Sequence, residues 1–102
     1  MFGIKKVNIN NQYIKYKVPF TTSTYLIKWF PKSQSNIHSH KGKECDFVPL
    51  WGDLLEVRYK NQIGKSRTIK QLHLSHINDK KGKHQVFNHD NYNKWSIHRY
   101  YI

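Results

Sequence analysis

The chain has 102 residues, and we expect residues 1–102 to form one domain in which 1–12 are a lead-in. This length excludes large multi-domain machinery, and an aromatic content of 15% favours a folded chain over a disordered one. The 18 lysines and arginines outnumber the 6 acidic residues, which gives a formal net charge of +12 with neutral histidines.

Strands separated by turns are predicted in the first half, with no helix of useful length. Residues 25–30 are rich in aromatic and β-branched side chains, and this strand ends at Pro31, which lacks an amide N–H. A polar loop over residues 32–36 follows. Two more strands are predicted at 47–50 and at 54–59, where side chains alternate as in a half-buried strand.

The second half continues the same pattern. Residues 61–64 are typical of a hairpin turn, and the strand after it is predicted at 67–74. A second turn at 78–82 leads into a strand at 84–88, and the aromatic segment 95–101 closes the chain. Short strands at this regular spacing predict an all-β fold, either a sandwich or a small barrel.

The use of cysteine and of apolar residues indicates the compartment. Cys45 is the single cysteine, whereas small secreted domains normally carry several disulfides. The N-terminus has no apolar run of signal-peptide length, and no segment approaches the roughly 18 apolar residues of a membrane span. We therefore expect a cytoplasmic, monomeric protein with no membrane partner.

The positive charge favours encounter with polyanions such as nucleic acid. The lysines, however, are spread along the whole chain and are not gathered into one basic helix or arm. Scattered lysines are more typical of a solvated surface than of a dedicated nucleic-acid site. Nucleic acid is therefore a partner that the sequence allows but does not favour.

Seven histidines are present, and two of them share one face of an extended segment. His38 and His40 are two residues apart, so their side chains point the same way on a strand and can bind one metal ion. Taken alone, this short motif favours a solvated pair in a polar loop. We expect surface or turn roles for the histidines that have no partner at a useful spacing: His73, His76 and His89.

The surroundings of these histidines resemble a known superfamily. The stretch 31–52 resembles the first metal-binding motif of the cupins, and the stretch 77–88, which contains His84, resembles the second. One cupin family, the cysteine dioxygenases, is similar in five segments that have the same order and nearly the same spacing. These are residues 35–40, Cys45, 50–56, 77–84 and 96–100. The resemblance covers roughly residues 13–100 and implies a jelly-roll cupin β-barrel.

This resemblance implies a metal centre and a reaction. In the family three histidines hold the metal, and they correspond here to His38, His40 and His84. Three neutral ligands leave positions open on ferrous iron for a thiolate and dioxygen. The implied activity is oxidation of a small thiol such as cysteine to its sulfinic acid, with Fe(II) as cofactor and Mn or Ni as alternatives.

The resemblance also assigns catalytic side chains near the C-terminus. The family's cysteine, which becomes thioether-linked to a tyrosine, corresponds to Cys45, and that tyrosine corresponds to Tyr100. Ser96 and His98 correspond to a hydrogen-bonded relay that leads to the tyrosine. Residues 96, 98 and 100 face one side of a strand, which is the geometry that such a relay requires.

The substrate contact departs from the family pattern. Residues 13–18, which begin with Tyr13, resemble the segment in which an arginine holds the substrate carboxylate, but Lys15 stands at the arginine position. Lysine is a point charge without the bidentate fork of arginine. The implied substrate-binding residues are Lys15 and Tyr13.

A second departure leaves other functions open. Glu44 stands where many cupins, though not the cysteine dioxygenases, place a fourth metal ligand. If Glu44 binds the metal, a position for thiol or oxygen is lost and a different reaction follows. The alternatives are thus a metal-binding cupin of other chemistry and a non-catalytic cupin that binds nucleic acid or another polyanion.

Overall fold

The computed structural model describes residues 5–39 and 42–102, and this part of the chain forms strands and turns without a helix. None of it could therefore cross a membrane as a helix. The strands are β1 (Lys5–Ile9), β2 (Tyr13–Lys17), β3 (Thr24–Trp29), β4 (Ser33–Gln34), β5 (Glu44–Trp51), β6 (Leu54–Lys60), β7 (Ile63–Ile69), β8 (Ser75–Ile77), β9 (Lys83–Asn88) and β10 (Lys94–Tyr101). The prediction of an all-β fold is confirmed.

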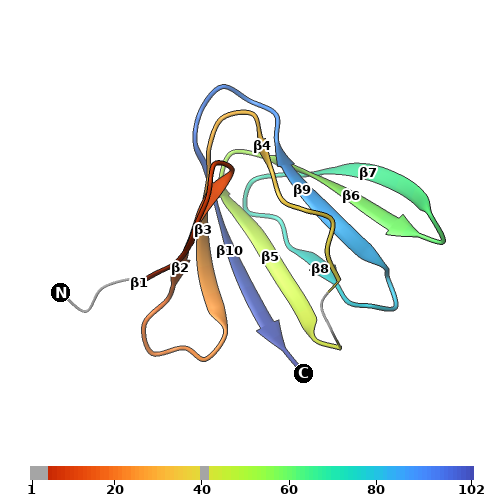
Figure 1. Cartoon of the computed structure of the whole chain (residues 1–102), viewed down its shortest axis with the longest axis horizontal. Helices are drawn as coiled ribbons and strands as arrows, with labels where there is room; N and C mark the ends of the chain where they lie inside the picture. Colours follow the sequence, from red (N-terminus) through yellow and green to blue (C-terminus); the bar gives the residue numbers. More distant parts are fainter. Residues whose placement is uncertain (1–4, 40–41) are drawn as a thin grey trace.

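The strands form two antiparallel sheets. The larger sheet has the order β1-β2-β3-β10-β5-β8, and the smaller has the order β4-β9-β6-β7. In Figure 1, β3, β10 and β5 run side by side in the larger sheet, while β9, β6 and β7 form the other part of the molecule. Within the described residues the sheets keep free edges at β1, β8, β4 and β7, so they do not close into a continuous barrel.

The hairpin of β6 and β7 differs from the sequence-based prediction. The turn consists of Asn61 and Gln62, both with positive φ (53° and 66°), as a tight two-residue hairpin requires. β7 therefore begins at Ile63, which pairs with Lys60, and it ends at Ile69. The predicted strand at 67–74 was wrong in position, because β7 is polar and exposed up to its last residue and carries no hydrophobic alternation.

Strand β5 continues through a proline that would normally interrupt a central strand. Its neighbour β8 pairs only with residues 45–47, so the missing N–H of Pro49 lies beyond that ladder. On the other side, the register with β10 shifts between Trp95 and Ser96, where Ser96 is the partner of Pro49. A bulge next to the proline thus lets β5 extend to Trp51.

The core lies between the sheets and is small. Its buried apolar side chains come from inward positions of both sheets: Ile27, Trp29, Phe47, Leu54, Ile69 and Val86. The inward row of β10 is polar instead, since Ser96 and His98 are both buried. His84 on β9 and Glu56 on β6 are buried as well. The interior therefore changes from an apolar core to a polar region, and the candidate site lies in this polar region.

Candidate active site

A cavity of about 250 Å³ is lined by residues of both sheets. The strands that contribute are β2, β3 and β10 of the larger sheet and β9 of the smaller sheet, together with the segment after β4. Six of the residues that the sequence singled out line this cavity: Tyr13, Lys15, His38, His84, His98 and Tyr100. The structure thus brings together residues that are up to 87 positions apart.

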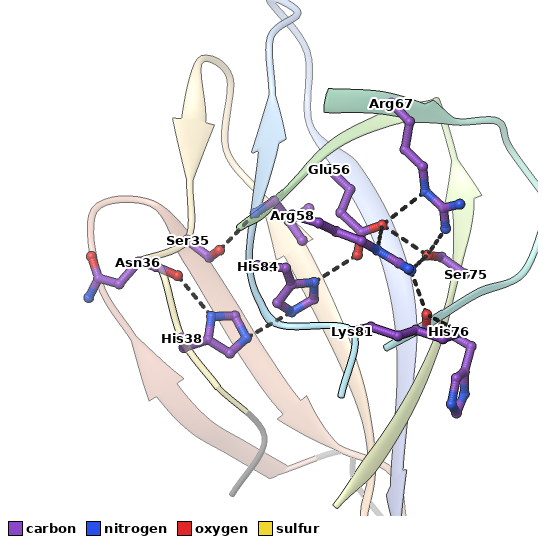
Figure 2. A network of polar contacts seen from close by, with 11 residues as sticks. Ser35, Asn36, His38, Glu56, Arg58, Arg67, Ser75, His76, Lys81 and His84 are labelled. Carbon is purple, nitrogen blue, oxygen red and sulfur yellow. Dashed lines mark hydrogen bonds and ion pairs between the residues drawn. The ribbon is translucent and has the colours of Figure 1, made fainter. Parts of the chain in front are cut away.

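His38 and His84 are held opposite each other by their own backbones. The amide of each donates to the carbonyl of the other, at 3.0 Å in both directions, as an isolated antiparallel bridge. Their imidazole Nε2 atoms then lie 3.0 Å apart (Figure 2). The main-chain hydrogen bonds fix the backbone positions from which the two side chains approach each other.

The second nitrogen of each ring determines its tautomer. His38 Nδ1 donates to the Asn36 carbonyl at 2.8 Å, and His84 Nδ1 donates to the Glu56 carboxylate at 2.8 Å (Figure 2). Carbonyl and carboxylate oxygens only accept, so the proton of each neutral ring is on Nδ1 and the Nε2 lone pairs face each other. Such a pair needs a proton or a cation between the two nitrogens.

Burial keeps His38 neutral. Desolvation lowers its pKa below the usual range, the hydrogen bond to the Asn36 carbonyl opposes this, and the charges of His84 and Lys15 lower the pKa further. A neutral imidazole is the form that binds a metal. Protonation of His38 is therefore unfavourable, and a metal cation between the two Nε2 atoms is the better way to stabilise the facing lone pairs.

Glu56, which the sequence analysis did not assign, organises the surroundings of His84. Its side chain is fully buried and accepts hydrogen bonds from Arg58 Nε at 3.0 Å, Arg67 Nε at 3.2 Å and Ser75 Oγ at 3.1 Å, besides that from His84. Burial alone would raise the pKa of Glu56, but the His84 hydrogen bond and the charge of Arg58 outweigh it and lower this pKa to about 2. Glu56 is thus a carboxylate that fixes the His84 tautomer.

The histidine pair fits a metal ion. Two nitrogens bound to one metal at about 2.1 Å and at a right angle lie about 3 Å apart, as the two Nε2 atoms do. In metal-bound histidines the second ring nitrogen donates a hydrogen bond to a carboxylate or a carbonyl. Here the Glu56 carboxylate and the Asn36 carbonyl are these acceptors. His40, the third predicted ligand, lies outside the described residues, and among the described ones no group of three His, Cys, Asp or Glu is placed to hold a metal.

Cys45 and Tyr100 are directly opposite each other on β5 and β10, and their side chains are hydrogen-bonded. Cys45 is fully buried. Burial and the charge of Asp46 raise its pKa to about 12, although the Tyr100 hydrogen bond opposes this. Burial and Cys45 raise the pKa of Tyr100 as well. Both groups are therefore neutral at physiological pH, with sulfur beside phenol as the implied thioether requires, while the linkage itself stays a prediction.

Ser96 and His98 form a hydrogen-bonded pair beneath the cavity. Trp29 Nε1 donates to Ser96 Oγ at 2.9 Å, and Ser96 Oγ lies 2.6 Å from His98 Nε2. The His98 ring stacks on Phe47, with centroids 4.9 Å apart and an interplanar angle of 8°. Ser96, His98 and Tyr100 lie at alternate positions of β10, on one face, as the sequence indicated.

Lys15 reaches the cavity from β2. Its Nζ lies 4.4 Å from the Tyr25 ring centroid and 5.1 Å from that of Tyr100. Burial lowers its pKa, and Cys45 opposes this shift. Tyr13, two residues earlier on the same face, packs against Trp29 with ring centroids 5.2 Å apart. A cation thus lies beside Tyr100, where an anionic group of a ligand would be stabilised.

Glu44 lies elsewhere. Its Oε1 accepts hydrogen bonds from His76 Nε2 and Asn78 Nδ2, each at 3.1 Å, and the second nitrogen of His76 lies 2.6 Å from Asp46 Oδ1. The reason is the two-residue period of a strand: Cys45 points inward, so Glu44 points outward. The structure does not bring Glu44 to the histidine pair. His76, for which a surface or turn role was expected, lies half-buried on β8, where the pairing with β5 places Asp46 opposite it.

A scan of protein-family models finds no match, and a search of curated proteins finds none. Solved structures match in fold. CENP-C of Drosophila melanogaster, bound to CAL1, has a TM-score of 0.77 at 8% identity, over 95% of this chain and 79% of that one. CapF, a capsular polysaccharide assembling protein from Staphylococcus aureus, has a TM-score of 0.79 at 15% identity, over 98% and 29%. An oxalate oxidase has a TM-score of 0.67 at 16% identity, over 76% and 40%.

These similarities identify the architecture. The structure of the Drosophila melanogaster CENP-C cupin domain also matches, with a TM-score of 0.74 over 95% of this chain. The chain therefore has the jelly-roll cupin fold that the sequence predicted. At 8% to 16% identity the likeness shows the fold alone, and it includes both an oxidase and CENP-C. Any function has to be argued from the residues of the cavity.

Proposed function

We propose that this chain is a non-haem iron thiol dioxygenase that oxidises a small thiol to its sulfinic acid. The observation that carries the proposal is the pair of Nε2 atoms of His38 and His84, 3.0 Å apart, in a cavity that also contains Lys15 and Tyr100. A metal-binding pair, a cation and a neutral phenol are the groups that this reaction needs. The similarity of five segments to the cysteine dioxygenases supports the same assignment.

The overall reaction balances without a further reductant. A thiol and one dioxygen give one sulfinic acid, so both oxygen atoms end on sulfur, and the four electrons that sulfur loses are those that dioxygen gains. His38 and His84, with His40 as the third ligand, would hold the iron, which would supply the redox chemistry of the reaction. The residues of the chain bind and orient the substrate and exclude water.

Lys15 defines the class of substrate. A lysine that is partly buried beside Tyr100 and Tyr25 gains most from an anionic partner, and a carboxylate on the thiol provides one. The cavity of about 250 Å³ lies below the roughly 300–1,000 Å³ of sites for drug-sized ligands, which suits a molecule of the size of cysteine. The substrate is thus a small thiol that carries a carboxylate.

Tyr100 would act as a hydrogen-bond donor to substrate or dioxygen. Its raised pKa keeps the phenol protonated at neutral pH, and the residue lines the cavity with its ring centroid 5.1 Å from Lys15 Nζ. The alternate positions on β10, His98 and Ser96, are buried and hydrogen-bonded to each other, so the strand presents Tyr100 from a rigid base. Tyr100 is accordingly a catalytic residue of the proposal, and His98 and Ser96 are positioning residues.

The test is product detection. The purified chain is loaded with ferrous iron and given oxygen with cysteine, 3-mercaptopropionate or cysteamine, and sulfinate is sought by mass spectrometry. We expect sulfinate from the two carboxylate thiols and much less from cysteamine. His84→Ala should lose both iron and turnover, whereas His73→Ala, at an exposed position outside the cavity, should keep them. Full turnover in His84→Ala, or bound iron without sulfinate, contradicts the proposal.

A further inference from the structure

A groove of about 560 Å³ runs beneath the β6–β7 hairpin, separate from the cavity with the histidine pair. None of the described residues that line the groove is acidic. Five of them are cationic: Arg58, Lys60, Lys65, Arg67 and Lys81. Residues 57–78 contain no aspartate or glutamate. The hairpin and the turn before β9 thus bring together three of the lysines and two of the three arginines of the sequence.

The register of the hairpin places like charges against each other. Arg58 on β6 is directly opposite Lys65 on β7. Lys60 on β6 and Arg67 on β7 are the next residues on the same face of the hairpin. Like charges directly opposite in a sheet are destabilising. Lysines on an edge strand such as β7 can protect it from aggregation, but β6 lies inside its sheet, between β9 and β7, so that role does not explain Arg58 and Lys60.

Internal neutralisation is incomplete. Arg58 and Arg67 both donate hydrogen bonds to Oε1 of Glu56, and Oε2 of the same carboxylate accepts a hydrogen bond from His84 Nδ1 (Figure 2). Two guanidinium groups therefore share one negative charge. The side chain of Arg67 remains 48% exposed, and Lys60, Lys65 and Lys81 are exposed. The groove carries a net positive charge that an external anion would neutralise.

We infer that this groove binds the phosphate backbone of a nucleic acid. Cations at alternate positions of two adjacent strands form two parallel rows that repeat about every 7 Å, which suits a chain of regularly spaced phosphates better than a single anion. Two arginines add the planar donor groups that recognise phosphate. None of the described residues that line the groove is aromatic, so base stacking does not contribute from them, and binding should depend little on sequence.

The experiment measures fluorescence anisotropy of a labelled DNA duplex of mixed sequence against the full chain over a series of salt concentrations. The groove variant is Lys60→Gln, Lys65→Gln and Lys81→Gln. We expect it to bind about tenfold or more weakly than the unaltered chain, with a salt slope smaller by about one per lysine. Binding should persist in EDTA, so this result is independent of the iron proposal.

The matched control removes the same charge away from the groove, by Lys6→Gln, Lys28→Gln and Lys32→Gln. We expect this control to keep most of the affinity. Equal losses in the two variants, or no binding of the duplex by the unaltered chain at about 50 mM salt, would overturn the inference. Binding of phosphatidylserine vesicles in place of DNA would also overturn it. If the groove variant does not fold, Lys65→Gln alone, at an exposed site, gives the same comparison with Lys6→Gln.

Discussion

His38 and His84 are joined twice, by a two-way backbone bridge at 3.0 Å and by Nε2 atoms that lie 3.0 Å apart. The first relationship places the two residues opposite each other, and the Nδ1 hydrogen bonds to the Asn36 carbonyl and to Glu56 orient the rings. The oxygen partners of the two Nδ1 atoms favour the tautomer with the proton on Nδ1, in which both Nε2 atoms present lone pairs to the same point. We read this arrangement as a prepared metal site, and the predictions below follow from it and from its surroundings.

Glu56 should control metal affinity through His84. Glu56→Gln replaces the negative acceptor of His84 Nδ1 by a neutral amide, and losses of this kind usually cost about 10–100-fold in metal affinity. A competition titration with a coloured chelator measures this. Asp53→Asn removes an exposed carboxylate that bonds to the Gln71 amide and should leave the affinity unchanged. Equal affinity in Glu56→Gln and the unaltered chain would show that Glu56 serves only the stability of the fold.

Lys15 should set the preference for a carboxylate. Lys15→Met is expected to raise KM for 3-mercaptopropionate by about tenfold or more, since an anion then loses its partner, and to leave cysteamine little changed. Lys15→Arg should lower KM, because a guanidinium can hold a carboxylate with two hydrogen bonds. Steady-state kinetics with both thiols separates these effects. A similar rise in KM for cysteamine in Lys15→Met would contradict a charge-specific role.

Cys45 and Tyr100 should become covalently linked during turnover. The link joins Cys45 sulfur to the tyrosine ring with loss of two hydrogens to dioxygen, so the intact chain becomes lighter by two hydrogen atoms. Mass spectrometry before and after turnover with iron and thiol measures this. Tyr100→Phe should show no such change, and Tyr101→Phe, on the opposite face of β10, should still show it. An unchanged mass after many turnovers in the unaltered chain would refute the linkage.

Before any linkage forms, the buried thiol should make the fold sensitive to alkali. The pKa of Cys45 is raised to about 12 in the fold, above the usual value of about 8.5. The contribution of the protonated thiol to the free energy of unfolding is therefore complete below pH 8 to 9 and is lost as the pH rises toward 12. In iron-free chain, the free energy of unfolding should fall by up to about 1.4 kcal/mol per pH unit in this range. Denaturant titrations should show a shallower fall for Cys45→Ala; an identical slope would contradict this assignment.

Gly82 should be the glycine that tolerates a side chain least. It has φ of +105°, and a Cβ there would lie 2.2 Å from the Tyr59 carbonyl oxygen. Gly42 also has a positive φ, +83°, but a Cβ there would meet nothing within 4 Å. Gly42→Ala should cost about 1 kcal/mol for its left-handed backbone, and Gly82→Ala should cost about 2 kcal/mol more because of the clash. Thermal unfolding of the two variants measures these losses of stability, and equal losses would contradict the prediction.

Much of the fold could be predicted from local pattern. The strands at β3, β5, β6, β9 and β10 have alternating or aromatic sequences, and each was found within a few residues of its predicted place. Strand β7 was displaced, and β1, β2, β4 and β8 were not predicted as strands. Strands β4, β7 and β8 are short or polar and lie at sheet edges, where they bury too few apolar side chains to give a periodic signal. Their positions depend on pairing with distant strands.

The candidate site likewise contains residues that could be predicted from the sequence and residues that could not. His84 was assigned through the resemblance to a family, since no local spacing connects it with His38, 46 residues earlier. The role of Glu56 was not assigned, although a carboxylate two residues after the buried Leu54 is a signal for an inward-pointing charge. Its partners Arg67 and Ser75 come from β7 and β8, and such contacts follow only from the tertiary structure.

The most direct test of the central claim uses dioxygen labelled with heavy oxygen. The iron-loaded chain is given 3-mercaptopropionate under this gas in ordinary water, and the sulfinate is analysed by mass spectrometry. Our account predicts that both oxygen atoms of the sulfinate carry the label and that His38→Ala and His84→Ala form none of this product. A sulfinate with oxygen from water, or labelled product at full yield from either variant, would contradict it.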